Sequence, residues 1–133
     1  MAKNYQDITH EISSYLKDLY KLIPETMNGF SSMAKSASST KGIDEKTKEM
    51  IALALGVAAK CDGCLGFHTK ALVRLGATRD EIAEVLGMAI YMGGGPSLMY
   101  AADALRAFDQ HTETLLEKNA SNSNSKLGLA VEG

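Results

Sequence analysis

The chain of 133 residues contains no tryptophan, and only 6% of its residues are aromatic. Its core volume must therefore come from leucine, isoleucine, alanine and the seven methionines. No segment alternates apolar and polar residues in the way that a half-buried β-strand requires. These absences predict an all-α protein with a core of aliphatic side chains.

The sequence also lacks a large excess of charge of one sign and any long apolar run. The formal net charge is −2, with acidic and basic residues mixed along the chain, so no basic patch indicates nucleic acid or anionic lipid. The longest apolar-rich run, residues 50–59, is too short to span a bilayer. The first residues, MAKNYQDITHEISS, lack the apolar segment of a signal peptide. We therefore expect a cytoplasmic protein with no nucleic-acid and no membrane partner.

Capping residues and apolar periodicity predict about six helices. Apolar residues recur three and four positions apart in several segments, and prolines, glycines and capping residues mark their ends. The expected helices cover 6–22, Pro24 to the SASSTKG linker at 36–42, 45–60 after the cap Asp44, 61–75 before Gly76, the stretch from the Thr78–Glu81 capping box to the GGGP break at 93–96, and 97–116. Residues 50–59 are apolar all round, which predicts a helix buried in the centre.

Residues 1–118 are expected to form a single domain, since the length corresponds to about one domain. Residues 119–133 are polar and of low complexity, which predicts a disordered tail. The apolar stripes of the second, fifth and sixth helices are wide for so short a chain, which predicts a homo-oligomer. His10 and His111 lie in ordinary amphipathic helices and are expected on the surface.

The two cysteines lie within the stretch KCDGCLGFH at 60–68. Cys61 falls at a predicted helix start, where unpaired backbone N–H groups favour a thiolate. Cys64 follows near enough for a disulfide, and His68, one turn beyond Cys64, could accept the thiol proton. Two interpretations compete with a redox pair: buried unreactive thiols, and a zinc site completed by His68 and Glu49. Structural zinc sites usually have a second Cys/His pair, which this sequence lacks.

The position of Glu49 follows from helix geometry. If the third and fourth helices form an antiparallel hairpin that turns near Lys60, Glu49 lies opposite residue 71, about 4.5 Å along the axis from His68. This predicts that the Glu49 carboxylate orients His68, which in turn serves Cys64, with Cys61 as the partner thiol. The alternatives are a core histidine bonded to backbone and a solvated glutamate.

Glu49, eleven intervening residues, CDGC, three more residues and His68 resemble the signature of the AhpD-like alkylhydroperoxidase group in the carboxymuconolactone decarboxylase superfamily. The following LGATRDEIAEVL and GGGP are similar to that group as well, so the resemblance covers about residues 20–110. It implies a compact helical subunit with a central CxxC hairpin, assembled into trimers or hexamers. The best-studied members place a histidine between the cysteines, where this sequence has Asp62 and Gly63.

The resemblance also implies the roles of the site residues. Cys64 would react with the hydroperoxide and Cys61 would close the disulfide, while Glu49 and His68 would form a proton relay, partly through water. The expected function is a thiol-dependent peroxidase or disulfide reductase in antioxidant defence. An external dithiol or redox protein would act as reductant, and no metal, flavin or nicotinamide is implied.

Two other functions remain as alternatives at this point. The first is a lyase of the carboxymuconolactone decarboxylase type, since the superfamily includes that activity. Its reaction does not need a CxxC pair, so the motif argues against it. The second is a non-enzymatic, oligomeric module that senses redox state or binds zinc.

Overall fold

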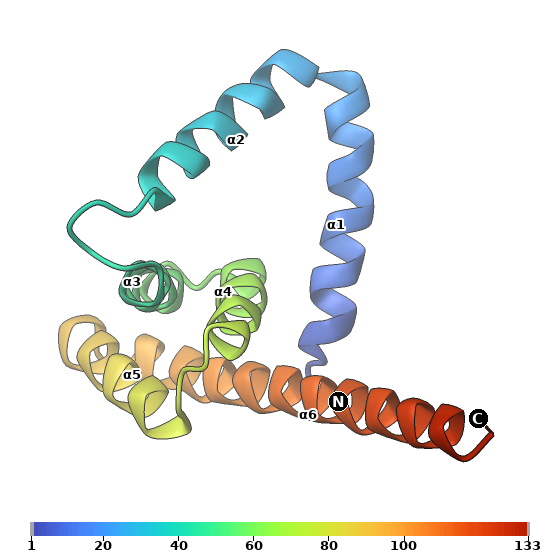
Figure 1. Cartoon of the computed structure of the whole chain (residues 1–133). Helices are drawn as coiled ribbons and strands as arrows, with labels where there is room; N and C mark the ends of the chain where they lie inside the picture. Colours follow the sequence, from blue (N-terminus) through green and yellow to red (C-terminus); the bar gives the residue numbers. More distant parts are fainter. Residues whose placement is uncertain (1, 133) are drawn as a thin grey trace.

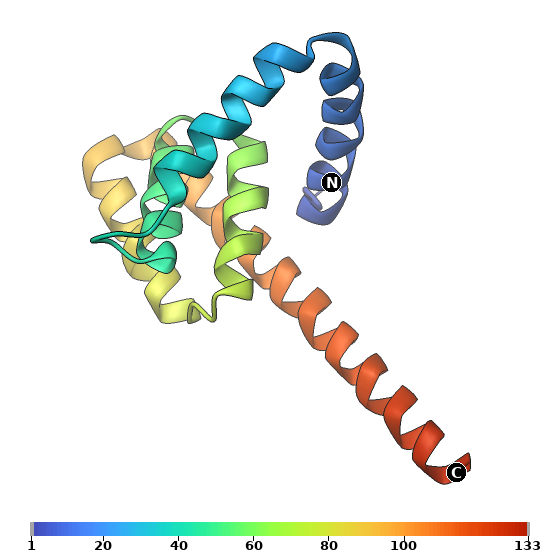
Figure 2. The same cartoon turned by 45° about the horizontal axis from the view of Figure 1, so that its top comes forward.

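The computed structural model describes residues 2–132, and within that range it contains six helices and no strand, which confirms the all-α class (Figure 1). The helices are α1 (Tyr5–Leu22), α2 (Pro24–Ser38), α3 (Glu45–Ala58), α4 (Asp62–Arg74), α5 (Arg79–Gly93) and α6 (Gly95–Glu132). Helices α3, α4, α5 and the first half of α6 pack together. Helices α1 and α2 form an open V beside this bundle, and the second half of α6 extends beyond it (Figure 2).

The residues that predicted the helix ends are the ones that cap them. Asp44 accepts the N–H of Thr47 at 2.7 Å and opens α3. The Thr78 hydroxyl and the Glu81 carboxylate form a reciprocal capping box at the start of α5. Gly76 follows α4 with φ 78°, a left-handed conformation that glycine adopts without steric cost. These caps explain why the boundaries of α3, α4 and α5 were predicted to within a few residues.

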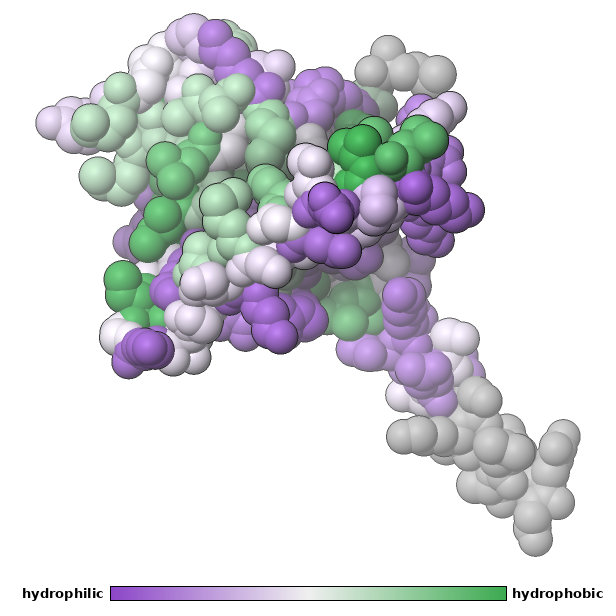
Figure 3. Space-filling model, turned by 90° about the horizontal axis from the view of Figure 1, so that it is seen from above, coloured by the Kyte–Doolittle hydropathy of each residue, from purple (hydrophilic) through white to green (hydrophobic). Residues whose placement is uncertain are grey.

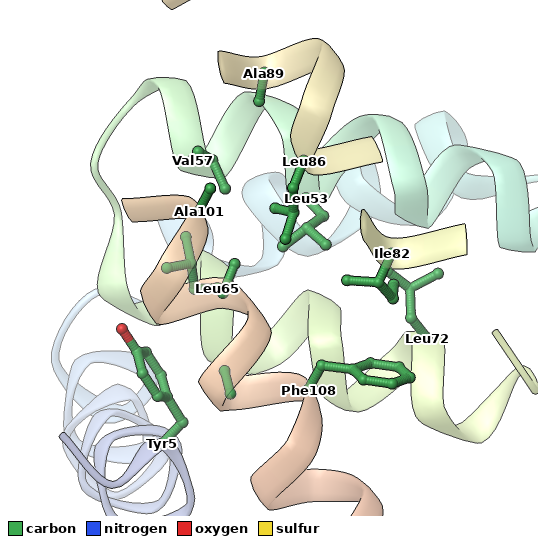
Figure 4. Close-up of a cluster of buried hydrophobic side chains, with 12 residues drawn as sticks. Tyr5, Leu53, Val57, Leu65, Leu72, Ile82, Leu86, Ala89, Ala101 and Phe108 are labelled. Carbon is green, nitrogen blue, oxygen red and sulfur yellow. The ribbon is translucent and has the colours of Figure 1, made fainter. Parts of the chain in front are cut away.

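The core is narrow and aliphatic, as the scarcity of aromatic residues predicted. The buried hydrophobic side chains, most of them labelled in Figure 4, are Tyr5, Leu53, Val57, Leu65, Leu72, Ile82, Leu86, Ala89, Ala101, Ala104, Ala107 and Phe108. Three of the alanines recur every third residue along α6, so this helix can lie close to α4 and α5. Each fully buried leucine or isoleucine contributes about 1.5–3 kcal/mol. Since α3 and α4 supply four of these aliphatic side chains, the core fixes the α3–α4 hairpin.

Helix α3 corrects the prediction that residues 50–59 are buried on all sides. Leu53, Gly56 and Val57 are buried, but the side chains of Ile51 and Leu55 are 47% and 65% exposed. The prediction was wrong because α4, α5 and α6 pack against one side of α3 and leave its other side open. The apolar outer side of α3 is therefore available for further contacts.

His111 corrects a second prediction. It was expected on the surface, but it is 3% exposed, whereas His10 is exposed as predicted. The His111 ring lies under α1, where its Nδ1 atom is 2.9 Å from Nε2 of Gln6. The pattern of α6 alone could not show that a helix more than a hundred residues earlier covers this position.

Helix α6 extends beyond its predicted end at residue 116 and continues to Glu132. Residues 119–133 were expected to form a disordered tail, and residue 133 of that segment lies outside the described range. Residues 119–124 are exposed. The helix extends here because each residue added to an existing helix gains a backbone hydrogen bond without a new nucleation step.

The V formed by α1 and α2 contributes little to the core. Helix α2 has no buried residue, and α1 buries only Tyr5 and Thr9. The large apolar side chains that these two helices and their junction expose are Tyr15, Leu19, Tyr20, Leu22, Ile23, Phe30 and Met33. Figure 3 views the molecule from this side and shows apolar side chains gathered in patches on the surface. None of the described helices is long and apolar enough to cross a membrane.

Candidate active site

The turn between α3 and α4 presents the two cysteines. The N–H of Lys60 donates to the carbonyl of Val57 at 3.1 Å, and the N–H of Cys61 donates to the carbonyl of Gly56 at 3.0 Å. This hydrogen-bond pair is the Schellman motif, and Lys60 takes its left-handed position with φ 56°. The chain reverses sharply here, so that Cys61 becomes the N-cap of α4.

Cys61 and Cys64 are joined by a disulfide, with their Cα atoms 5.2 Å apart. The backbone N–H of Cys64 donates to Sγ of Cys61 at 3.1 Å, as a capping side chain would accept it. Both cysteines are partly buried. The geometry supports the prediction that the two sulfurs can bond, and it gives the Cys61 sulfur a donor from the start of the helix.

A glycine on α3 allows the two helices to meet at the cysteines. A Cβ atom at Gly56 would lie 2.8 Å from Cβ of Cys64, closer than side-chain carbons approach one another. The hairpin can therefore pack at this point only if residue 56 has no side chain. The sequence alone did not reveal this contact.

Glu49 and His68 meet as the hairpin geometry predicted. Nδ1 of His68 lies 2.6 Å from Oε2 of Glu49, and the two side chains are 33% and 20% exposed. A carboxylate accepts the Nδ1 proton, and a neutral ring then carries its lone pair on Nε2. His68 is one turn beyond Cys64 on α4, a spacing that puts the two Cβ atoms about 5–6 Å apart. The arrangement holds an oriented base next to a thiol.

A cleft of about 320 Å³ leads to the Glu49–His68 pair. Its lining residues are Ala37, Ser38, Ile43, Lys48, Glu49, Ile51, Ala52, Leu55 and His68. Lys48 donates from Nζ to the backbone carbonyls of Ala37 and Ser39 at 2.9 and 2.7 Å, which ties the end of α2 over the cleft. A small molecule with an apolar body could reach the carboxylate and the imidazole through this opening.

A third group of contacts, at the start of α4, was not predicted from the sequence. Lys3 donates from Nζ to carboxylate oxygens of Asp62 and Asp103, both at 3.0 Å, and lies 5.2 Å from the ring centre of Tyr100. Arg106 lies 3.7 Å from the second oxygen of Asp103. The two carboxylates raise the pKa of Lys3 above its usual range, so this lysine is charged at any physiological pH. Asp62, between the cysteines, was the visible signal, but its partner Lys3 is 59 residues away.

The four predicted site residues thus lie on one hairpin, Glu49 on α3 and the other three at the start of α4 and along it. No group of three or more His, Cys, Asp or Glu side chains among the described residues has the arrangement of a metal site. Among these residues, Glu49 pairs with His68 and the two cysteines pair with each other.

The sequence and the helical fold of this chain have counterparts among known proteins. Residues 24–107, from the start of α2 into α6, match the sequence model of the carboxymuconolactone decarboxylase family, and the chain belongs to that family. The membership confirms the resemblance that the sequence showed.

Individual relatives agree with this assignment. A carboxymuconolactone decarboxylase family protein from Legionella pneumophila is 55% identical, with a TM-score of 0.80 over 81% of this chain and 96% of that one. A family protein from Thermotoga maritima, for which a role in antioxidative response is suggested, is 25% identical with a TM-score of 0.73 over 84% and 94%. An uncharacterized protein of Cupriavidus necator is 42% identical over 99 residues, 74% of this chain and 88% of that protein.

Proposed function

We propose that the protein is a thiol-dependent hydroperoxidase that acts through Cys64, Cys61, His68 and Glu49. The observation that carries the proposal is the contact of Glu49 with His68, which orients a base one turn from a cysteine of a bonded pair. The suggested antioxidative role of the Thermotoga maritima relative supports it. A buried structural histidine would not need a carboxylate partner that is itself open to a cleft.

The proposed reaction begins with the reduced pair. His68 takes the thiol proton of Cys64, and the thiolate attacks one oxygen of the hydroperoxide ROOH. The O–O bond breaks, the alcohol ROH leaves with a proton, and Cys64 becomes a sulfenic acid. The thiol of Cys61 then attacks the Cys64 sulfur, water leaves, and the disulfide forms. An external dithiol or redox protein reduces that disulfide by thiol exchange and is itself oxidised.

Two contacts favour opposite assignments of which cysteine reacts with the peroxide. The N–H of Cys64 donates to Sγ of Cys61, which favours Cys61 as the more acidic thiol. The nearby base of His68 favours Cys64 as the sulfur that meets the peroxide. We assign Cys64 to the peroxide and Cys61 to resolution and contact with the reductant, because proton transfer must occur where the peroxide reacts.

Single cysteine variants test the assignment. We expect Cys61→Ser, treated with one equivalent of peroxide, to form a sulfenic acid on Cys64 that a dimedone-type probe labels. The matched variant Cys64→Ser should react with peroxide no faster than an ordinary thiol. The reverse labelling pattern would show that the helix-terminus effect dominates and that the roles are exchanged.

Two further assays separate the alternative functions. A decarboxylase would still turn over its lactone when both cysteines are replaced by serine, whereas the proposed peroxidase loses all peroxide turnover. Stoichiometric zinc in the purified, reduced protein would favour the zinc-binding module instead. Neither outcome depends on knowing the natural reductant.

We also propose that the protein works as a homo-oligomer, a trimer or hexamer. Helices α5 and α6 expose Met88, Tyr91, Met92 and Met99 to 59%, 79%, 78% and 68%, in addition to the apolar side chains of α1 and α2. Exposed apolar patches on this scale usually mark association surfaces. Light scattering at micromolar concentration should give the mass of three or six chains, and a monomer would refute this part of the proposal.

A further inference from the structure

The acidic residue between the two cysteines is held by the first residues of the chain. Asp62 is the first residue of α4, and its carboxylate accepts Nζ of Lys3 at 3.0 Å. Two hydrogen bonds from α6 fix the backbone that carries Lys3. Gln110 donates from Nε2 to the carbonyl of Lys3 at 2.9 Å and accepts the N–H of Tyr5 with Oε1 at 2.7 Å. The side chain of Lys3 is thereby aimed at the CxxC turn.

The charges at this end of α4 balance. Lys3 bridges Asp62 and Asp103, and Arg106 lies beside Asp103, so two cations face two carboxylates. Without Lys3, one negative charge would be in excess next to Cys61. A negative charge close to a thiol disfavours the thiolate, whereas the start of a helix favours it. Asp62 and the helix start therefore oppose each other at Cys61, and Lys3 offsets the carboxylate.

We propose that Lys3 is a positioning residue that neutralises Asp62 and so keeps the thiolate of Cys61 accessible at neutral pH. The inference builds on the proposed function in one respect, that Cys61 exchanges with an external dithiol. The Cys61 thiolate attacks the Cys64 sulfenic acid when the disulfide forms. When the external dithiol resets the pair, its thiolate attacks Cys61, and Cys61 later leaves the mixed disulfide as a thiolate, so a stabilised Cys61 thiolate favours both steps. Lys3 would then set the rate at which the disulfide forms and is reset, without touching the peroxide.

The other titratable groups on elements next to this turn are Lys60, Tyr5, His68 and Glu49. Burial raises the pKa of Tyr5 to about 12, so its ring stays neutral across the range of the test. The Glu49–His68 pair stays the same in every variant compared below. Differences between variants therefore report the Lys3–Asp62 contact.

The test measures Cys61 by itself, in the full-length chain with Cys64→Ser. Iodoacetamide alkylates the sulfur as the thiolate displaces iodide, so the rate against pH follows the thiolate fraction. We expect Lys3→Met to lower the rate at pH 7 about 3- to 10-fold, the effect of one uncompensated charge near a partly exposed thiol. Lys3→Arg keeps the charge and should stay within about twofold of the parent.

A double-mutant cycle isolates the role of Asp62. Asp62→Asn alone should raise the alkylation rate at pH 7, and adding Lys3→Met to it should have a much smaller effect than in the parent. The side chains of Lys3 and Asp62 are 37% and 41% exposed, so the effect of Lys3→Met should shrink in 1 M salt. Loss of packing alone would produce neither the cycle nor the salt dependence.

Three results would overturn the inference. They are an unchanged pH–rate profile in Lys3→Met, an undiminished effect of Lys3→Met on the Asp62→Asn background, and a slower rather than faster alkylation of Asp62→Asn. Asp62→Asn leaves the first residues intact and keeps the test decisive if Lys3→Met fails to fold. Peroxide turnover is not part of this measurement, so failure here and failure of the peroxidase proposal are distinguishable.

Discussion

Two histidines, His68 on α4 and His111 on α6, each use Nδ1 for their main contact. His68 meets the carboxylate of Glu49 at 2.6 Å, at the edge of a cleft. His111 meets the amide of Gln6 at 2.9 Å, and its Nε2 atom is buried without a hydrogen-bond partner among the described residues. The first ring is a third exposed and the second is 3% exposed.

The difference shows what turns a histidine into a candidate base. Burial lowers the pKa of His111, and the nearby backbone of Gly66 opposes this only in part, so the ring stays neutral. Since an amide nitrogen can only donate, Nδ1 of His111 is the acceptor. His68 has a carboxylate partner on Nδ1 and has access to solvent. The buried His111 on α6 has a structural contact, whereas the contact of His68 on α4 fits the proposed role of a base.

The buried side of α4 should show the largest effect on stability. Leu72→Ala removes a fully buried side chain and should lower the free energy of unfolding by about 3 kcal/mol, within the usual range for such a cavity. Denaturant unfolding followed by circular dichroism measures it. Lys70→Ala on the exposed side of the same helix is the control and should change the value by less than about 0.5 kcal/mol. Equal effects would mean that α4 has no distinct core side.

Glu49→Gln gives His68 the kind of partner that His111 has. We expect the fold to persist and peroxide turnover to fall about 100-fold, the usual contribution of a proton-transfer group. The control is Glu45→Gln, one turn earlier on α3, where the carboxylate pairs with the exposed Arg74. Steady-state peroxide consumption with a dithiol reductant compares the two. Unchanged turnover in Glu49→Gln would assign Glu49 a structural role only.

Gly66→Ala tests the contact of α4 with α1. The added Cβ would lie 2.5 Å from Cγ2 of Thr9, so the substitution should cost about 2 kcal/mol of stability through overpacking. Gly87→Ala is a matched control, because nothing lies within 4 Å of its added Cβ and alanine favours the helix by about 0.5–1 kcal/mol. Thermal unfolding should move in opposite directions for the two variants. A shared direction would contradict the close approach of α1.

His111 should make stability depend on pH. The folded pKa lies below the ordinary value of 6.5, so the unfolded chain binds the proton first and stability falls as the pH drops below about 6.5. One proton gives a slope of at most about 1.4 kcal/mol per pH unit. Denaturant unfolding between pH 7 and 5 should show a flatter dependence for His111→Gln than for wild type. Identical slopes would mean that His111 titrates normally in the fold.

Local sequence determined what could be predicted. The cap Asp44 and the Thr78–Glu81 capping box predict the starts of α3 and α5 from residues within four positions of each other. The helical period on either side of a short turn predicts that Glu49 lies close to His68. These signals are local because helix ends and hairpins are made by neighbours in sequence.

Contacts between distant segments could not be read in this way. Gln6 covers His111 from 105 residues away, and Lys3 reaches Asp103 from 100 residues away, through pairings that no period or cap encodes. The outer side of α3 was misjudged for the related reason that an apolar run does not say whether its cover comes from the same chain. The contact between Glu49 and His68 was predictable, and the contacts of Lys3 and Gln6 with α6 were not.

The turn before α4 and the turn after it are closed by the same pair of hydrogen bonds. The left-handed position is occupied by Lys60 in the first turn and by Gly76 in the second. A side chain in the left-handed region costs about 1 kcal/mol relative to glycine. A library randomised at position 60 and selected for stability alone should therefore return glycine. Selection for turnover should return lysine only if its ammonium group favours the reaction at Cys61. The amino acid recovered would therefore show whether stability or turnover determines the residue at position 60.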